Sequence, residues 1–298
     1  MHQAYIEPHA CLARYDSDGQ GEIWTSSQGH FVVRGLTAKL VGMNLADLKV
    51  IPAEIGGGFG GKTVVYLEPL ALMLAKKSGL PVRLAMSREE VFKASGPTSG
   101  ASMTVKIGIK KDGTLTAAQG VFRFQAGAFP GSPVMNACLC AFSPYTIPNQ
   151  KAVGYDVVSN RPKAAAYRAP GSPISAFGVE SVLDILAKKI GMDPLEMRMK
   201  NAAHIGSPTI AGPKIAHEGY AETVQAMIDH PGYKAKLGPN QGRGVASGHW
   251  FNGAGQSGAT VFLNTDATVP IPPARPDTRG PRAPIAPLPP RPPGAARH

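Results

Sequence analysis

The amino-acid sequence predicts an α+β fold in which mixed sheets are flanked by helices. Short strand-like runs alternate with helix-spaced apolar segments over most of the 298 residues. The runs Met103 to Ile109 and Leu115 to Phe124 are separated by an Asp-Gly turn, which predicts an antiparallel hairpin. Because a hairpin joins antiparallel strands, purely parallel sheets are not expected.

Turn and capping residues delimit the elements expected in the N-terminal part of the chain. In order, these elements are a strand at Ile23 to Ser26, a helix at Phe31 to Val41, a strand at Leu48 to Ile51, a helix at Leu67 to Ser78 and a strand at Pro81 to Met86. Gly42 and Gly79 follow the two helices and are typical C-terminal caps. Pro69 is compatible only with a first helical turn. Ser87 to Glu90 have the spacing of a capping box that opens a further short helix.

Two more helices are expected farther along. The longest is Ile174 to Ile190, ended by Gly191; its buried face is expected to carry Phe177, Val182, Leu186 and Ile190. Asp193, Pro194 and Glu196 provide the cap, the first-turn proline and the N3 acid of the next helix.

The C-terminal residues have a different composition. Eleven of the 28 prolines fall in Pro270 to His298, without apolar periodicity, so a disordered Pro/Arg-rich tail is expected there. This tail also holds five arginines and one aspartate of a chain whose net charge is +11. Since the remaining basic residues occur as pairs at expected helix ends, such as Lys76-Lys77, a nucleic-acid partner is not expected.

Apolar run lengths and cysteine number limit the protein class further. The longest apolar stretches, such as Leu70 to Ala75, are far below the roughly 20 residues of a membrane span. The N-terminus lacks a signal-peptide pattern, so a cytoplasmic location is expected. Cys11, Cys138 and Cys140 are too few for a disulfide framework or an iron–sulfur site and are expected to be buried thiols.

Gly56 to Thr63 carry the strongest functional signal. Their glycines permit positive φ and close approach of backbone N–H groups to a ligand. The segment also satisfies the P-loop pattern, so a nucleotide-binding protein is one alternative, and a glycine turn without a ligand is another. Against the P-loop, Pro52 interrupts the preceding strand and Phe59 would crowd a phosphate. Val182 to Asp184, which could resemble a magnesium-binding strand end, lie within a helical pattern.

Three segments together resemble one enzyme family. They are Glu54 to Lys62, with the pattern G-G-G-F-G-G-K; Tyr5 to Ala13, followed by Trp24 to Gln28; and Tyr167 to Gly171, which leads into the helix with Phe177 and Glu180. These motifs, and their order along the chain, resemble those of the molybdopterin-binding large subunit of the xanthine dehydrogenase, aldehyde oxidase and carbon monoxide dehydrogenase family. The resemblance implies the fold of the first molybdenum-cofactor-binding domain.

The resemblance also implies a set of site residues. Gln28 matches a glutamine that hydrogen-bonds an oxygen ligand of molybdenum, and Arg168 matches an arginine that helps to hold the oxygen ligands. The loop residues expected to approach the cofactor are Gly57, Gly58, Phe59 and Gly60. Amide donors and a guanidinium suit this role because both can stabilise charge developing on oxygen. Taken singly, Gln28 could instead cap the following helix, and Arg168 could pair with Glu180.

Departures from the family pattern concern the substrate. Thr63 stands where purine-oxidising members have a glutamate, and Asn136 stands where they have a second arginine; both positions face the substrate in the family. Ala169 to Gly171 replace the cysteine-containing loop of the carbon monoxide dehydrogenase branch. The resemblance therefore implies an aldehyde or a neutral N-heteroaromatic substrate rather than xanthine.

For the whole chain, the resemblance implies a fragment of a larger assembly. Residues 1–240 are expected to be the first molybdopterin-binding domain, in part. Residues 241–269 would be the truncated start of the second domain, with strands at 242–251 and 259–264.

The implied cofactor is molybdenum–molybdopterin in its cytosine dinucleotide form, and the iron–sulfur groups and FAD are expected on partner subunits. The parent activity would be hydroxylation of a small molecule with water-derived oxygen. Because the glutamate that acts as general base has no match here, the chain is expected to be inactive alone; a non-catalytic interaction protein remains an alternative.

Overall fold

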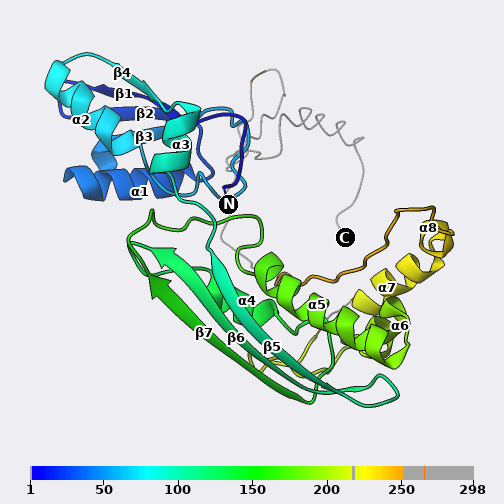
Figure 1. Cartoon of the computed structure of the whole chain (residues 1–298). Helices are drawn as coiled ribbons and strands as arrows, with labels where there is room; N and C mark the ends of the chain where they lie inside the picture. The colour runs from blue at the N-terminus through cyan, green and yellow to red at the C-terminus, as the bar shows by residue number, and fades with distance from the viewer. Residues whose placement is uncertain (1, 217–218, 252–264, 266–298) are drawn as a thin grey trace. The chain divides into compact units, whose positions relative to one another are not determined.

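The computed structural model describes residues 2–216, 219–251 and 265. They fold into two compact units, the first spanning Gln3–Ser95 and the second starting at Gly96. In Figure 1 the first unit runs from blue to cyan and the second from teal through green and yellow to orange. Each unit has a mixed sheet with flanking helices, which confirms the predicted class. The boundaries expected near residues 240 and 269 stay predictions.

The first unit is built on a four-stranded sheet of order β3-β2-β1-β4. The strands are β1 (Ala10–Tyr15), β2 (Gly21–Thr25), β3 (Leu48–Pro52) and β4 (Val82–Ala85). β1 pairs antiparallel with β2 and β4, whereas β2 and β3 are parallel. Three of these strands lie where the sequence predicted them, but β1 was not predicted as a strand.

Helices and one short turn connect the strands of this sheet. They are α1 (His30–Val41), η1 (Leu45–Asp47), α2 (Glu68–Ser78) and α3 (Arg88–Ala94). The expected ends are confirmed: Gly42 and Gly79 adopt left-handed conformations with φ of 70°, and Ser87 and Glu90 form a complete capping box. The buried core of the unit includes Ile23 and Leu72.

The second unit contains a three-stranded sheet of order β5-β6-β7. The strands are β5 (Ala101–Ile109), β6 (Leu115–Gly127) and β7 (Asn149–Val158). β5 and β6 form the predicted antiparallel hairpin, and β6 pairs with β7 in parallel. The chain between β6 and β7 contains α4 (Val134–Cys140), which packs against both strands. Neither β7 nor α4 was predicted.

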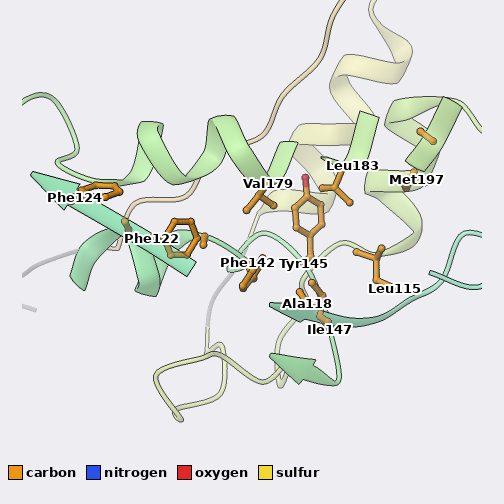
Figure 2. Close-up of a cluster of buried hydrophobic side chains, with 13 residues drawn as sticks. Leu115, Ala118, Phe122, Phe124, Phe142, Tyr145, Ile147, Val179, Leu183 and Met197 are labelled. Atoms are coloured by element: carbon orange, nitrogen blue, oxygen red, sulfur yellow. The ribbon is translucent and has the colours of Figure 1, made fainter. Parts of the chain in front are cut away.

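The remaining helices of this unit follow β7 in sequence. They are α5 (Ser172–Ile190), α6 (Pro194–Lys200), α7 (Tyr220–Asp229) and α8 (Pro231–Lys234). Asp193 caps α6 as expected, by accepting hydrogen bonds from the backbone N–H groups of Leu195 and Glu196. Figure 2 shows the core, in which Phe122 and Phe124 of β6 lie with Val179 and Leu183 of α5.

Two expectations about local structure are wrong. The buried face of α5 carries Val179, Leu183 and Ala187, whereas Phe177, expected on that face, is 72% exposed. Residues 242–251 have no regular secondary structure, so the strand expected there is not formed. The strand expected at 259–264 and the tail at 270–298 lie outside the described residues. Every helix among the described residues is too short or too polar to pass through a lipid bilayer.

Candidate functional site

The glycine-rich loop joins β3 to α2 in the first unit. Its backbone takes positive φ at Gly57 (93°), Phe59 (51°) and Gly60 (105°). A tight turn is closed by the hydrogen bond from Gly61 N–H to the Gly58 carbonyl, at 2.7 Å. The Thr63 hydroxyl donates to the Gly60 carbonyl at 2.9 Å. Phe59 is strained because left-handed backbone is unfavourable for a bulky residue, so the surrounding contacts must hold it.

Gln28 is bound to this loop through its side-chain oxygen. Gln28 Oε1 accepts hydrogen bonds from the backbone N–H groups of Gly60 (2.8 Å) and Lys62 (3.2 Å). Since both partners are donors, the atom that faces them is the oxygen, and the NH₂ group points elsewhere. Gln28 Nε2 has no hydrogen bond to the described residues and is left as a donor.

The close contact between Gln28 and the loop requires a glycine. A Cβ on Gly58 would lie 2.5 Å from Gln28 Oε1, a separation that real Cβ atoms do not show. The alternative role of Gln28 as a helix cap is wrong, because the N-cap of α1 is Gly29, with no side-chain capping bond.

Glu7 and Lys62 form a part-buried ion pair that is bonded to the loop. Glu7 Oε2 accepts from Lys62 Nζ at 2.6 Å and from the Gly56 N–H group at 2.8 Å. Lys62 is 1% exposed and also approaches the Pro8 carbonyl, at 3.4 Å. Burial lowers the pKa of Lys62, and the hydrogen bond with Glu7 opposes this change. Both motifs can be read from the sequence, but the ion pair that links them was not predicted.

These contacts do not support the P-loop alternative. A P-loop presents free backbone amides and a lysine to the phosphates of a nucleotide. Here Gln28 already occupies two loop amides, and Lys62 is paired with Glu7. The loop is therefore organised around a glutamine side chain.

Two buried hydroxyls adjoin Gln28. Ser26 and Ser27 are 5% and 2% exposed, and neither hydroxyl has a partner among the described residues. Buried polar groups are normally hydrogen-bonded, so such atoms call for a further partner. The segment that leads to Gln28 therefore carries two hydroxyls whose hydrogen-bonding capacity is unused among the described residues.

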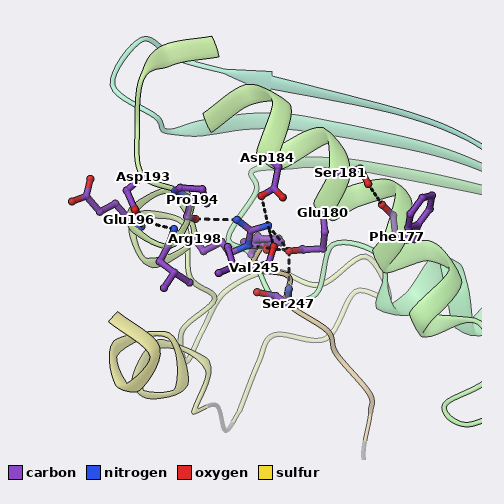
Figure 3. A network of polar contacts seen from close by, with 12 residues as sticks. Phe177, Glu180, Ser181, Asp184, Asp193, Pro194, Glu196, Arg198, Val245 and Ser247 are labelled. Atoms are coloured by element: carbon purple, nitrogen blue, oxygen red, sulfur yellow. Dashed lines mark hydrogen bonds and ion pairs between the residues drawn. The ribbon is translucent and has the colours of Figure 1, made fainter. Parts of the chain in front are cut away.

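Arg168 belongs to the second unit and lies in a strained loop. φ is 22° at Arg168 and 52° at Ala169. The Arg168 side chain is exposed and makes no ion pair with the described residues. The alternative pairing with Glu180 is wrong, because Glu180 binds Arg198 instead (Figure 3). The guanidinium of Arg168 thus remains available to an anionic group.

Asn136 is half-buried on α4, next to the loop of Arg168. Gly171, with φ of 94°, approaches the start of this helix so closely that a Cβ would lie 2.3 Å from the Pro133 carbonyl oxygen. The second unit therefore brings the Arg168 loop and the helix of Asn136 together. Gln28, the glycine-rich loop and Thr63 all belong to the first unit.

The cysteines behave as expected of buried thiols. All three are free; Cys11 and Cys140 are buried and Cys138 is half-buried. Burial raises the pKa of Cys11 to about 12, and it also raises the pKa of Cys140. Thiols with raised pKa values are poor nucleophiles at neutral pH, so these side chains act as packing groups.

Comparison with known proteins identifies relatives of the chain. The family model described as "Molybdopterin cofactor-binding domain" matches residues 1–202. The chain is 30% identical over 225 residues to the nicotinate dehydrogenase large molybdopterin subunit of Eubacterium barkeri, a match that covers 74% of this chain and 53% of that protein. It is 31% identical over 283 residues to the aldehyde oxidoreductase of Megalodesulfovibrio gigas, covering 89% of this chain and 31% of that protein.

A solved structure agrees with these matches. The aldehyde oxidoreductase from Desulfovibrio gigas superposes with a TM-score of 0.78 and 28% sequence identity, over 90% of this chain and 31% of that chain. The chain therefore spans 53% of one of these relatives and 31% of the other two.

Proposed function

This chain belongs to the molybdopterin cofactor-binding domain family, and from that premise we propose that it supplies a cofactor-binding part of a molybdenum hydroxylase large subunit. The proposed parent activity is the hydroxylation of an aldehyde or N-heteroaromatic substrate with oxygen derived from water. The names of its relatives, which include an aldehyde oxidoreductase and a nicotinate dehydrogenase, support this substrate class.

The orientation of Gln28 carries the proposal. Two loop amides hold its oxygen, so that its NH₂ group is left to donate a hydrogen bond outward. Gly58 leaves no side chain between the loop and this amide. The unpartnered hydroxyls of Ser26 and Ser27, which precede Gln28 in the sequence, are proposed to add further donors. This donor set fits a cofactor that carries oxygen atoms.

The proposed roles of the residues follow from their chemistry. When bound, the molybdenum cofactor supplies the redox centre for oxygen transfer and two-electron oxidation. Gln28 would donate a hydrogen bond to a cofactor oxygen, and Gly57 to Gly60 would let the main chain approach. Arg168 would stabilise negative charge on oxygen through its guanidinium. Thr63 and Asn136 are uncharged, which suits a neutral substrate at the positions that they are proposed to border.

The wider setting is also part of the proposal. The pterin would carry a cytosine dinucleotide, and partner subunits in the cytoplasm would hold the iron–sulfur groups and FAD. Residues 1–240 would serve the first cofactor-binding domain and residues 241–269 the start of the next. No glutamate of this chain has been identified as the general base, so the chain alone would be inactive.

Isolation of the native complex tests the proposed function. A tag on this chain would be used to purify the complex from the cells that make it. Molybdenum and iron would be measured by mass spectrometry, and pterin and flavin by fluorescence. We expect molybdenum and pterin in equal amounts, together with iron and FAD. A complex that contains neither molybdenum nor pterin would overturn the proposal.

A further inference from the structure

A buried ion pair lies at the centre of the second unit. Arg198 of α6 and Glu180 of α5 are 1% and 5% exposed, and Arg198 Nη2 lies 2.8 Å from Glu180 Oε2. Figure 3 shows that Arg198 also reaches the Pro194 carbonyl (3.0 Å) and Asp184 (2.9 Å). A buried pair of this kind contributes little net stability, because both charges are desolvated. The role of the Glu180–Arg198 pair must therefore be inferred from the other groups that it contacts.

The pair also binds a stretch of chain that lacks regular structure. Glu180 Oε2 accepts from the Ser247 N–H group at 2.7 Å, and Arg198 Nη2 donates to the Val245 carbonyl at 3.2 Å. The hydroxyls of Tyr220 and Ser247 lie 2.5 Å apart. Because residues 242–251 have no helix or strand partners, these side chains satisfy backbone groups that would otherwise be unpaired.

The same stretch continues to the start of α5. Ser172 Oγ donates to the His249 carbonyl at 2.5 Å. Ser172 directly follows the loop of Arg168, and its N–H group donates to the Ala169 carbonyl at 3.1 Å. Left-handed backbone at Arg168 and Ala169 persists only where neighbouring contacts enforce it. Ser172 therefore links the His249 carbonyl to this strained backbone through two hydrogen bonds.

We propose that residues 245–249 form a strap, latched by Glu180 and Arg198, which holds the Arg168 loop in its strained conformation. Glu180 and Arg198 are then positioning residues, which act through the strap and Ser172 rather than through contact with a ligand. The strap itself is independent of the cofactor. Only the purpose of holding Arg168 rests on the proposed function.

Hydrogen exchange on the full chain tests the strap. Glu180→Gln removes the charge that binds Arg198 and Ser247. We expect amide exchange about tenfold faster or more in residues 245–251 and in residues 167–173, with unchanged exchange in the β5–β6 hairpin. A merely structural pair would instead accelerate exchange throughout the unit.

Asp184→Asn is the matched control. Asp184 contacts the same guanidinium, but its side chain is 43% exposed and makes no hydrogen bond with the described strap residues. We expect unchanged exchange in the strap and in the Arg168 loop. An equal effect of Asp184→Asn and Glu180→Gln would overturn the proposal.

Ser172→Ala covers the case in which Glu180→Gln lowers the stability of the whole unit. This variant removes the contact with His249, together with the hydrogen bond between the Ser172 hydroxyl and the Cys140 thiol, and leaves no buried charge. We expect faster exchange at residues 167–173 and an unchanged melting temperature. If the loop is protected equally in Ser172→Ala and the parent chain, the strap does not hold it. These measurements need no cofactor, so their failure is distinguishable from a complex that lacks molybdenum.

Discussion

At the scale of single residues, the direction of the Gln28 amide is the feature on which the proposed chemistry depends. Its oxygen is occupied by Gly60 and Lys62, so only a donor is presented outward. From the sequence, the resemblance to family motifs could identify Gln28 and the glycine-rich loop as candidate cofactor-binding residues. The pairing of Glu7 with Lys62 could not be predicted, because these residues are distant in sequence and either could have been solvated.

Gln28→Glu tests the donor directly. A carboxylate can still accept from the two loop amides but can no longer donate. We expect turnover by the intact complex to fall about 100-fold, as when an oxyanion-hole donor is removed. Thermal stability should change little, by roughly 0.5 kcal/mol. Gln119→Glu, on the exposed face of β6, is the control and should leave turnover unchanged; full activity of Gln28→Glu would contradict the assigned role.

Gly58→Ala tests the close approach of the loop. The new Cβ would overlap Gln28 Oε1, so we expect a loss of about 2 kcal/mol from overpacking. Gly35→Ala is the matched control, because Gly35 is exposed on α1 and no atom lies within 4 Å of its Cβ position. That change should stabilise the helix by about 0.5–1 kcal/mol. Urea unfolding measures both effects, and equal stability of the two variants would contradict the loop geometry.

At the scale of elements, helix ends could be predicted better than strands. Gly42, Gly79 and the box at Ser87 act through contacts a few residues apart, which a sequence displays directly. β7 was not predicted because its residues pair with residues of β6 that are distant in the sequence, such as Asn149 with Ala117. The face of α5 was predicted wrongly because its buried side includes Ser172, Ser175 and Glu180, which interrupt the apolar periodicity.

The capping box of α3 leads to a pH-dependent prediction. The hydrogen bond from the Ser87 backbone N–H group lowers the pKa of Glu90 from its ordinary 4.5. A lowered pKa means that the ionised carboxylate stabilises the fold above that ordinary value, and that this contribution is lost as the pH falls through the folded pKa.

Thermal unfolding of Glu90→Ala measures this contribution. We expect a lower melting temperature than the parent at about pH 7 and no difference at about pH 2. Ser87→Ala is the comparison, because the Ser87 hydroxyl still accepts from the Glu90 N–H group at low pH. It should cost about 1 kcal/mol at about pH 7 and less at about pH 2, because this hydroxyl also lowers the pKa of Glu90. A Glu90→Ala difference that is the same at both pH values would count against an ionised cap.

At the scale of the whole molecule, each compact unit has its own buried core. We expect Leu72→Ala to destabilise only the first unit and Leu183→Ala only the second, each by about 2–5 kcal/mol. Trp24 reports on the first unit and Trp250 on the second. Urea unfolding followed by each fluorophore, in variants that keep one tryptophan, should show one shifted and one unshifted transition. A single transition that moves equally in both variants would mean that the cores unfold together.

Chain connectivity explains why α4 lies beneath the Arg168 loop. Because β6 and β7 are parallel, the chain must cross back over the sheet between the end of β6 and the start of β7. α4 is part of this crossover connection and packs against both strands. The same seven-residue helix also receives Gly171 at its first turn. The parallel pairing of β6 with β7 and the packing of the Arg168 loop therefore constrain one short element at once. Amino-acid replacements in α4 should be tolerated far less often during evolution than replacements at outward-facing positions of the same sheet, such as Gln119.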